Sequence, residues 1–284
     1  MGPATKALAV SRGPYRLHAD ITPGAGAPVV LMHGFPDSTR LYDRLLPHLD
    51  GRMPVVRFDF LGWGLSDKPR GHPYTVENQV GDLAAVADAV TDALGARRLV
   101  LVAHDASGPP AIDWALANPD RVERLVLLNT YYHWTPALRR PPAIALYSTP
   151  LLRTVARAVV RRRPELDRRL YTWQVGGFIR DRAVRDPYVA RLYEQFPAAR
   201  PAFWRLNDDL LMTVLVRRRR IPDLRAFQPP VQVIFGARDR YLNARVARRF
   251  AALFPHSRLH LLAEAGHYVQ VDAPERVADL LVAG

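Results

Sequence analysis

The sequence contains no cysteine among its 284 residues. This absence excludes disulfides, thiol nucleophiles and thiolate metal sites, and it fits a reducing compartment. The chain also lacks any apolar run near the roughly 20 residues that span a bilayer. Residues 1–10 carry one lysine and no apolar stretch of the kind that signal peptides contain. From these absences we expect a cytoplasmic protein without a membrane span.

Acidic side chains are scarce relative to basic ones. The chain has 40 Lys and Arg against 27 Asp and Glu, which gives a formal net charge of +13 at pH 7. The basic runs 161–163 and 217–220 lack the interleaved aromatic and glycine residues of nucleic-acid modules. We therefore interpret them as solvated arginine-rich faces and expect no nucleic-acid partner. Acidic substrates stay open.

The order of apolar segments predicts one α/β domain with an insertion. Short apolar runs alternate with helical patterns, which predicts a mostly parallel central sheet with helices on both faces. The clearest helix covers 76–94 and ends at Gly95. Residues 131–220 show no clean strand pattern, so we predict a helical cap there, inserted in a core of 1–130 and 221–284. The predicted strands are 28–32, 54–58, 98–103, 122–128, 231–235 and 258–262.

The segment after the third predicted strand has the composition of a sharp strand-to-helix turn. Such a turn exposes its central side chain and needs small neighbours on both sides. Ala103 and Ser107 flank Asp105 at two residues' distance, which makes Asp105 the centre. With Ser107 at the centre, the flanking residue would be a large, charged aspartate. We therefore predict Asp105 as a nucleophile rather than as a helix N-cap.

Three further segments that follow predicted strands supply partners for Asp105. His267 follows a glycine near the C-terminus and is a candidate general base. Asp239 is placed to accept the second imidazole N–H and orient the ring. The backbone N–H groups of Phe35 and Ala106 are candidates for an oxyanion hole. The chain order of nucleophile, acid and base is the one that a strand–turn–helix nucleophile predicts.

These motifs resemble the α/β-hydrolase superfamily over essentially the whole chain. The aspartate at the turn is similar to the branch of epoxide hydrolases and haloalkane dehalogenases. The resemblance implies that the Asp105 carboxylate attacks carbon, and that water activated by His267 hydrolyses the resulting ester. It implies neither a cofactor nor a metal. The matching segments are His33-Gly34-Phe35-Pro36, Asp59 to Asp67, His104-Asp105 and Gly266-His267.

The nucleophile type limits the reaction class. A carboxylate is ionised at neutral pH and can displace a leaving group at saturated carbon. Against an ordinary ester it would form an anhydride that reverts or hydrolyses, so esterase activity is not expected.

Some residues differ from those of the branch, and these differences bear on which leaving group the chain can accept. Dehalogenases of this branch carry a tryptophan after the nucleophile that helps to hold the halide, and Ala106 stands in that place. Fluoroacetate dehalogenases carry arginines in this region, where Pro109 also stands. Epoxide hydrolases use two cap tyrosines, and Trp204 occupies the place of the second, before Arg205.

We therefore predict epoxide hydrolysis through an Asp-ester. The alternatives are a haloalkane or haloacid dehalogenase with the same mechanism, and a non-hydrolytic receptor or rearrangement catalyst on this fold. The expected substrate is a small apolar or aromatic electrophile, and the expected state is a monomer or homodimer. Candidate substrate contacts are His104, Trp134, Tyr147, Tyr171 and Trp204.

Overall fold

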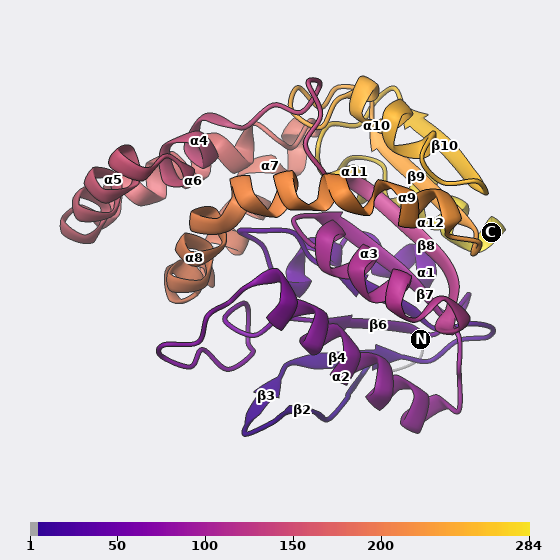
Figure 1. The fold of residues 1–284 in the computed structure, drawn as a ribbon. Helices are drawn as coiled ribbons and strands as arrows, with labels where there is room; N and C mark the ends of the chain where they lie inside the picture. The colour runs from indigo at the N-terminus through magenta and orange to yellow at the C-terminus, as the bar shows by residue number, and fades with distance from the viewer. Residues whose placement is uncertain (1–4) are drawn as a thin grey trace.

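The computed structural model describes residues 5–284 (Figure 1). Eight strands form one sheet in the order β1-β4-β6-β5-β7-β8-β9-β10. Neighbouring strands are parallel from β6 to β10, whereas β4 runs antiparallel to β1 and β6. The predicted mostly parallel sheet is confirmed. Its strands are β1 (Lys6–Ala7), β4 (Ala19–Thr22), β5 (Val29–Met32), β6 (Val55–Phe58), β7 (Leu99–Asp105), β8 (Val122–Thr130), β9 (Val231–Gly236) and β10 (Ser257–Leu262).

The strands that the sequence analysis missed lie at the N-terminal edge. They are β1, β4 and a separate hairpin of β2 (Val10–Arg12) and β3 (Tyr15–Leu17). Each has two to four residues, and most of their side chains are exposed or half-buried. An edge strand with solvent on one side has no continuous apolar run, so its pattern resembles a loop.

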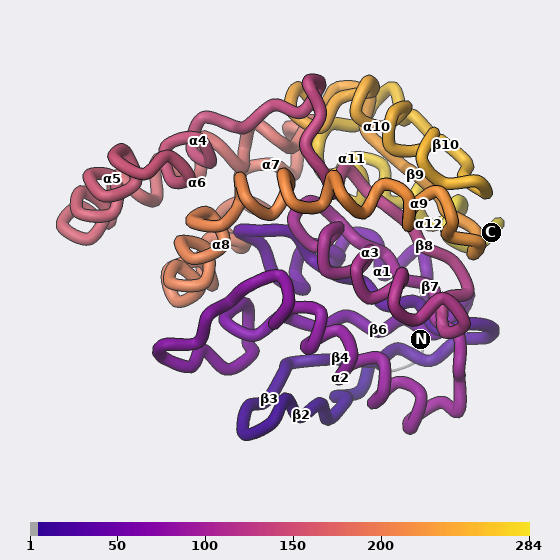
Figure 2. Tube along the Cα trace, in the orientation of Figure 1, coloured from indigo at the N-terminus to yellow at the C-terminus, as the bar shows by residue number. Residues whose placement is uncertain are grey.

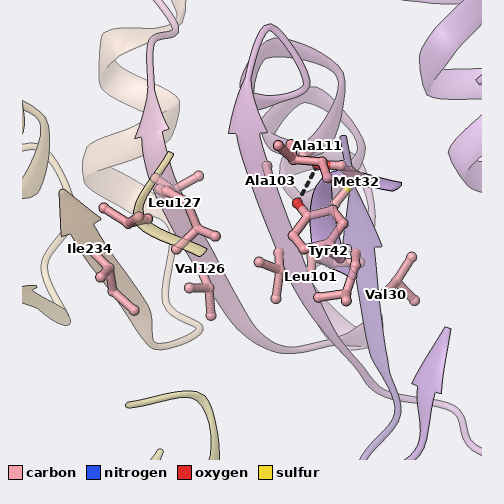
Figure 3. Close-up of a cluster of buried hydrophobic side chains, with 14 of the residues drawn as sticks. Val30, Met32, Tyr42, Leu101, Ala103, Ala111, Val126, Leu127 and Ile234 are labelled. Atoms are coloured by element: carbon pink, nitrogen blue, oxygen red, sulfur yellow. Dashed lines mark hydrogen bonds between the residues drawn. The ribbon is translucent and has the colours of Figure 1, made fainter. Parts of the chain in front are cut away.

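The central strands are buried on both faces and anchor the site. Every side chain of β5 is buried, as are those of β7 up to His104. Figure 3 shows part of this core, including Val30 and Leu101, with the Tyr42 hydroxyl donating to the Met32 carbonyl at 2.7 Å. Strands packed in this way hold their carboxyl ends in fixed positions.

Helices of the core cover both faces of the sheet. The predicted helix over 76–94 is confirmed, and Gly95 ends it with φ 66° in the left-handed region. The core helices are α1 (Leu46–Leu49), α2 (Val76–Leu94), α3 (Gly108–Ala117), α10 (Ala244–Ala251), α11 (Val269–Asp272) and α12 (Pro274–Ala283).

The segment between β8 and β9 is helical. Figure 2 shows the chain running outward through α4 and α5 and turning back through α6. The end of α6 lies beside the start of α4, where Gln174 accepts the Ala143 N–H at 3.1 Å. Pro187 lies inside α7 and Pro201 inside α8, and neither proline ends its helix. The helices are α4 (Pro142–Ser148), α5 (Pro150–Arg162), α6 (Pro164–Gly176), α7 (Arg182–Tyr193), α8 (Phe196–Val216) and α9 (Ile221–Ala226).

No single helix within residues 5–284 has the length and apolar character needed to cross a membrane. The pair α4 and α5 meets that test only in combination, and the two helices are bent by 104° where they join.

Candidate active site

Asp105 occupies a strained position between β7 and α3. Its φ is +49°, a left-handed value that costs a non-glycine residue free energy. Helix α3 starts so close to β8 that a Cβ on Gly108 would overlap the Thr130 hydroxyl. The tight turn therefore depends on a small residue at position 108, and it leaves the Asp105 side chain facing away from the core.

Ser107, the competing nucleophile in the sequence, has a structural place. Its side chain is fully buried, and its hydroxyl bonds the His104 carbonyl at 2.8 Å and the Met32 carbonyl at 3.1 Å. The His104 N–H donates back to it at 2.8 Å. The hydroxyl thus ties the turn to the end of β5 and is not directed toward substrate.

Two backbone N–H groups and one imidazole surround the Asp105 carboxylate. The Phe35 N–H lies 3.4 Å from Oδ2, the Ala106 N–H also donates to the group, and His267 Nε2 lies 3.9 Å from Oδ1. Burial raises the pKa of Asp105, and the charge of His267 and the two N–H groups oppose that rise only in part. The Asp105 side chain is 20% exposed, and a carboxylate that has lost part of its hydration is a stronger nucleophile than one in water.

His267 and Asp239 form a buried ion pair. His267 Nδ1 lies 2.7 Å from Asp239 Oδ2, and Asp239 Oδ1 accepts the N–H groups of Tyr241 and Leu242 at 2.8 and 3.1 Å. Burial alone raises the pKa of Asp239, but the His267 charge and these hydrogen bonds bring it below its ordinary value. Burial alone lowers the pKa of His267, but Asp239, Asp105 and Asp37 bring it above its ordinary value.

Asn129 and Asp37 belong to this cluster and escaped the sequence analysis. Asn129 follows the predicted strand 122–128, and its Nδ2 donates to Asp239 Oδ2 at 2.8 Å. Asp37 accepts the Tyr268 hydroxyl at 3.0 Å on each oxygen, and burial raises the pKa of Asp37 to about 7. The sequence does contain a signal for Asn129, because it is a polar residue directly after an apolar predicted strand.

A cavity of about 270 Å³ separates the strand ends from the cap, and its walls are mainly apolar. It brings together seven of the predicted residues. Tyr131, which the sequence analysis did not single out, also lines it. The predicted residues in its wall are Phe35, Asp105, Ala106, Trp134, Tyr147, Tyr171 and His267.

The two cap tyrosines differ in what their hydroxyls contact. The Tyr147 hydroxyl donates to Asp167 at 3.4 Å, and Asp167 is also paired with Arg200. The Tyr171 hydroxyl is buried and has no hydrogen-bond partner among the described residues. Burial raises the pKa of Tyr171 well above its ordinary value, and the Asp37 charge adds to the rise. Tyr171 therefore keeps its proton and has it free to donate.

His104 and Trp204 do not line the cavity, contrary to the expected substrate contact. His104 is fully buried beneath Asp105, with Nε2 at 3.1 Å from the His267 carbonyl, because β7 extends two residues beyond its predicted end. Trp204 lies on the other side of α8, where Arg157 and Arg161 stack on its ring at 5.4 and 5.0 Å. Trp134 does reach the cavity, at an exposed edge.

Comparison with known families agrees with this architecture. Residues 27–274 match the model of the alpha/beta hydrolase fold family. The chain belongs to this family. The mostly parallel eight-stranded sheet, with a helical segment between β8 and β9, agrees with this fold.

The relatives of this chain carry names of different activities. The chain is 30% identical over 283 residues to "Haloalkane dehalogenase 2" of Mycobacterium tuberculosis H37Rv, covering 96% of this chain and 91% of that protein. It is 29% identical over 277 residues to "Cis-3-alkyl-4-alkyloxetan-2-one decarboxylase" of Shewanella oneidensis, covering 94% and 84%.

A solved structure supports the fold. The chain superimposes on 2-hydroxy-6-oxo-6-phenylhexa-2,4-dienoate hydrolase from Rhodococcus sp. strain RHA1 with a TM-score of 0.80. That match covers 99% of this chain and 98% of the other at 18% identity. The family match and the 30% identical relative support a hydrolase of this family.

Proposed function

We propose that this α/β-hydrolase opens an epoxide through a covalent ester on Asp105. The observation that carries the proposal concerns Tyr171, which lines the same cavity as Asp105 and His267 and whose buried hydroxyl has no hydrogen-bond partner among the described residues. An epoxide leaves as an alkoxide, which needs a proton, and a halide does not. A buried, protonated phenol without another partner suits an oxygen leaving group.

The first step forms one bond and breaks one. An oxygen of the Asp105 carboxylate attacks an epoxide carbon, the carbon–oxygen bond of the ring breaks, and Tyr171 gives its proton to the alkoxide. The charge of Asp37 raises the pKa of both Tyr171 and His267, and the charge of Asp105 raises the pKa of Asp37. The protonation states of these groups therefore depend on one another. The product of this step is a hydroxyalkyl ester.

The second step hydrolyses that ester. His267 takes a proton from water, and the hydroxide attacks the Asp105 carbonyl carbon. The N–H groups of Phe35 and Ala106 stabilise the resulting oxyanion. Alkylation removes the Asp105 charge, which is one of the charges that raise the pKa of His267. His267 therefore loses its proton more easily at the stage that needs a base, and that proton restores the Tyr171 phenol. The diol leaves as the Asp105 carboxylate returns, and His267 keeps the proton taken from water.

A dehalogenase is the second candidate, and the 30% identical relative favours it. The same Asp105 attack would release halide. Stabilising a halide needs N–H or similar donors, and Ala106 supplies none from its side chain. The relative named for an oxetan-2-one adds a further strained oxygen ring to the electrophiles worth testing.

Trapping the ester tests the proposal. Protein with His267→Gln is incubated separately with epoxides, haloalkanes and a cis-3,4-dialkyloxetan-2-one. The mass of the peptide that contains Asp105 is then measured by mass spectrometry. We expect an adduct from an epoxide, at the mass of the intact epoxide. The double variant with Asp105→Asn is the control and should show none.

The other outcomes are informative. Adducts from haloalkanes alone replace the proposal with a dehalogenase, and adducts from the oxetanone alone replace it with a lactone-directed enzyme. If no electrophile labels a His267→Gln protein that binds an apolar ligand, the covalent mechanism is wrong and the non-hydrolytic alternative takes its place.

Tyr171 and Tyr147 give a matched pair of variants. We expect Tyr171→Phe to slow ester formation from an epoxide by about a hundredfold, because the alkoxide loses its acid. Tyr147→Phe should change it less than about tenfold, since the Tyr147 hydroxyl is bonded to Asp167. Rapid-quench mass spectrometry measures both rates. Equal losses in the two variants would assign the acid elsewhere.

A further inference from the structure

Helix α5 exposes an apolar face that no other segment within residues 5–284 covers. Leu151 and Val155 are 84% and 64% exposed, and Leu152 and Val159 are 51% and 40% exposed. Leu151, Val155 and Val159 follow one another at four-residue spacing, so they form one stripe along the helix. Only Ala156 and Val160 of α5 are buried. The apolar side of α5 is thus wider than its packing requires.

This stripe lies at the end of the molecule farthest from the sheet. Figure 1 shows α4, α5 and α6 extending away from the strands, with α5 outermost. The neighbouring helix α6 adds Leu166 and Trp173, which are 40% and 60% exposed. Single exposed apolar side chains are ordinary, but the α5 stripe lies along one face of a projecting helix, and such a stripe marks a surface that contacts something else.

Arginines border the stripe. Residues 150–176 contain seven arginines and two carboxylates. Within residues 5–284, no carboxylate pairs with Arg162 or Arg169. Of the two local carboxylates, Asp167 is buried against Arg200. An apolar stripe flanked by unneutralised arginines is the pattern of a helix that lies in the interface of a membrane.

We propose that the α5–α6 hairpin docks on an anionic lipid surface. A lipid interface accepts the stripe in its acyl region and the arginines among its phosphates. A second copy of the chain suits the same face poorly, because it would bring two arginine-rich borders together in a protein of net charge +13. The 104° bend between α4 and α5 means that the two helices do not form one straight apolar helix that could cross a bilayer. This inference is independent of the proposed reaction.

Vesicle co-sedimentation tests the proposal. We expect the full chain to bind vesicles of equal parts phosphatidylcholine and phosphatidylglycerol, and to bind pure phosphatidylcholine far less. Arg162→Gln with Arg169→Gln should weaken the partition coefficient by about fivefold for each charge. Leu151→Ser with Val155→Ser should weaken it by about tenfold for each side chain.

Matched controls separate the hairpin from general charge and hydrophobicity. Arg248 and Arg249 of α10 are exposed, and Leu65, in the loop between β6 and α2, is 64% exposed. Arg248→Gln with Arg249→Gln, and Leu65→Ser, should leave binding nearly unchanged. Equal loss in the arginine controls would overturn the proposal, as would absence of binding to the anionic vesicles. A dimer in sedimentation velocity that Leu151→Ser with Val155→Ser converts to monomer would also overturn it, since a second copy would then cover the stripe.

Discussion

Replacing Asp105 by Asn should abolish turnover and stabilise the fold at the same time. We expect hydrolysis to fall by at least about ten-thousandfold, because the amide cannot form the ester. We also expect the free energy of unfolding to rise by about 1 kcal/mol at neutral pH. Asn tolerates a φ of +49° and carries no charge to desolvate.

The pH dependence of that gain follows from the direction of the pKa shift. Burial raises the pKa of Asp105 in the folded chain, so its ionised form opposes folding above the unfolded-state pKa. The stabilisation by Asn is therefore present at neutral pH and disappears as the pH falls below the ordinary aspartate range. Urea unfolding of both proteins at neutral and acidic pH measures it. A variant less stable than the parent at neutral pH would show that the carboxylate holds the turn together.

Replacing Asp239 by Asn should stop the reaction at the ester. The carboxylate raises the pKa of His267 and fixes its Nδ1–H tautomer, and an amide does neither well. We expect ester hydrolysis to fall by about a thousandfold to ten-thousandfold, with ester formation reduced much less. The acid limb of the hydrolysis rate should move to lower pH, because the pKa of His267 falls.

Rapid mixing followed by mass spectrometry distinguishes the two steps. In the Asp239→Asn protein, nearly all Asp105 should carry the adduct at steady state. Asp113→Asn is a suitable control, because Asp113 is a paired carboxylate that lies outside the cavity, bonded to Tyr132 and Arg217. Adduct-free Asp239→Asn protein with slow turnover would show that Asp239 acts before the ester forms.

The scaffold of the site could be predicted because its determinants are local. Buried parallel strands need continuous apolar runs, and a tight strand-to-helix turn needs small residues at set positions. Ala103, Ser107 and Gly108 therefore identified the turn at Asp105, and the structure places that turn in the left-handed region. The core helix over 76–94 could be predicted equally well, because Gly95 marks its end.

The parts that escaped prediction depend on which way a side chain faces across long sequence separations. Asp167 lies four residues before Tyr171, yet it accepts the hydroxyl of Tyr147, 20 residues away, and the sequence does not indicate this choice. Trp204 was assigned to the cavity by its position beside Arg205, but the rotation of α8 turns its ring toward Arg157 and Arg161. Helix α8 itself was obscured because Pro201 interrupts its pattern.

The Tyr268–Asp37 contact joins residues 231 positions apart, one near each end of the chain. During synthesis, Asp37, Phe35 and Asp105 leave the ribosome long before His267 and Tyr268. Contacts of such long sequence separation form late in folding. A nascent chain can thus build the nucleophile turn early, yet it has no base beside that turn until its last strand and final helices emerge. A truncated chain that ends before β10 also lacks His267. Such a chain should form the Asp105 ester at most once, because it has no base to hydrolyse it.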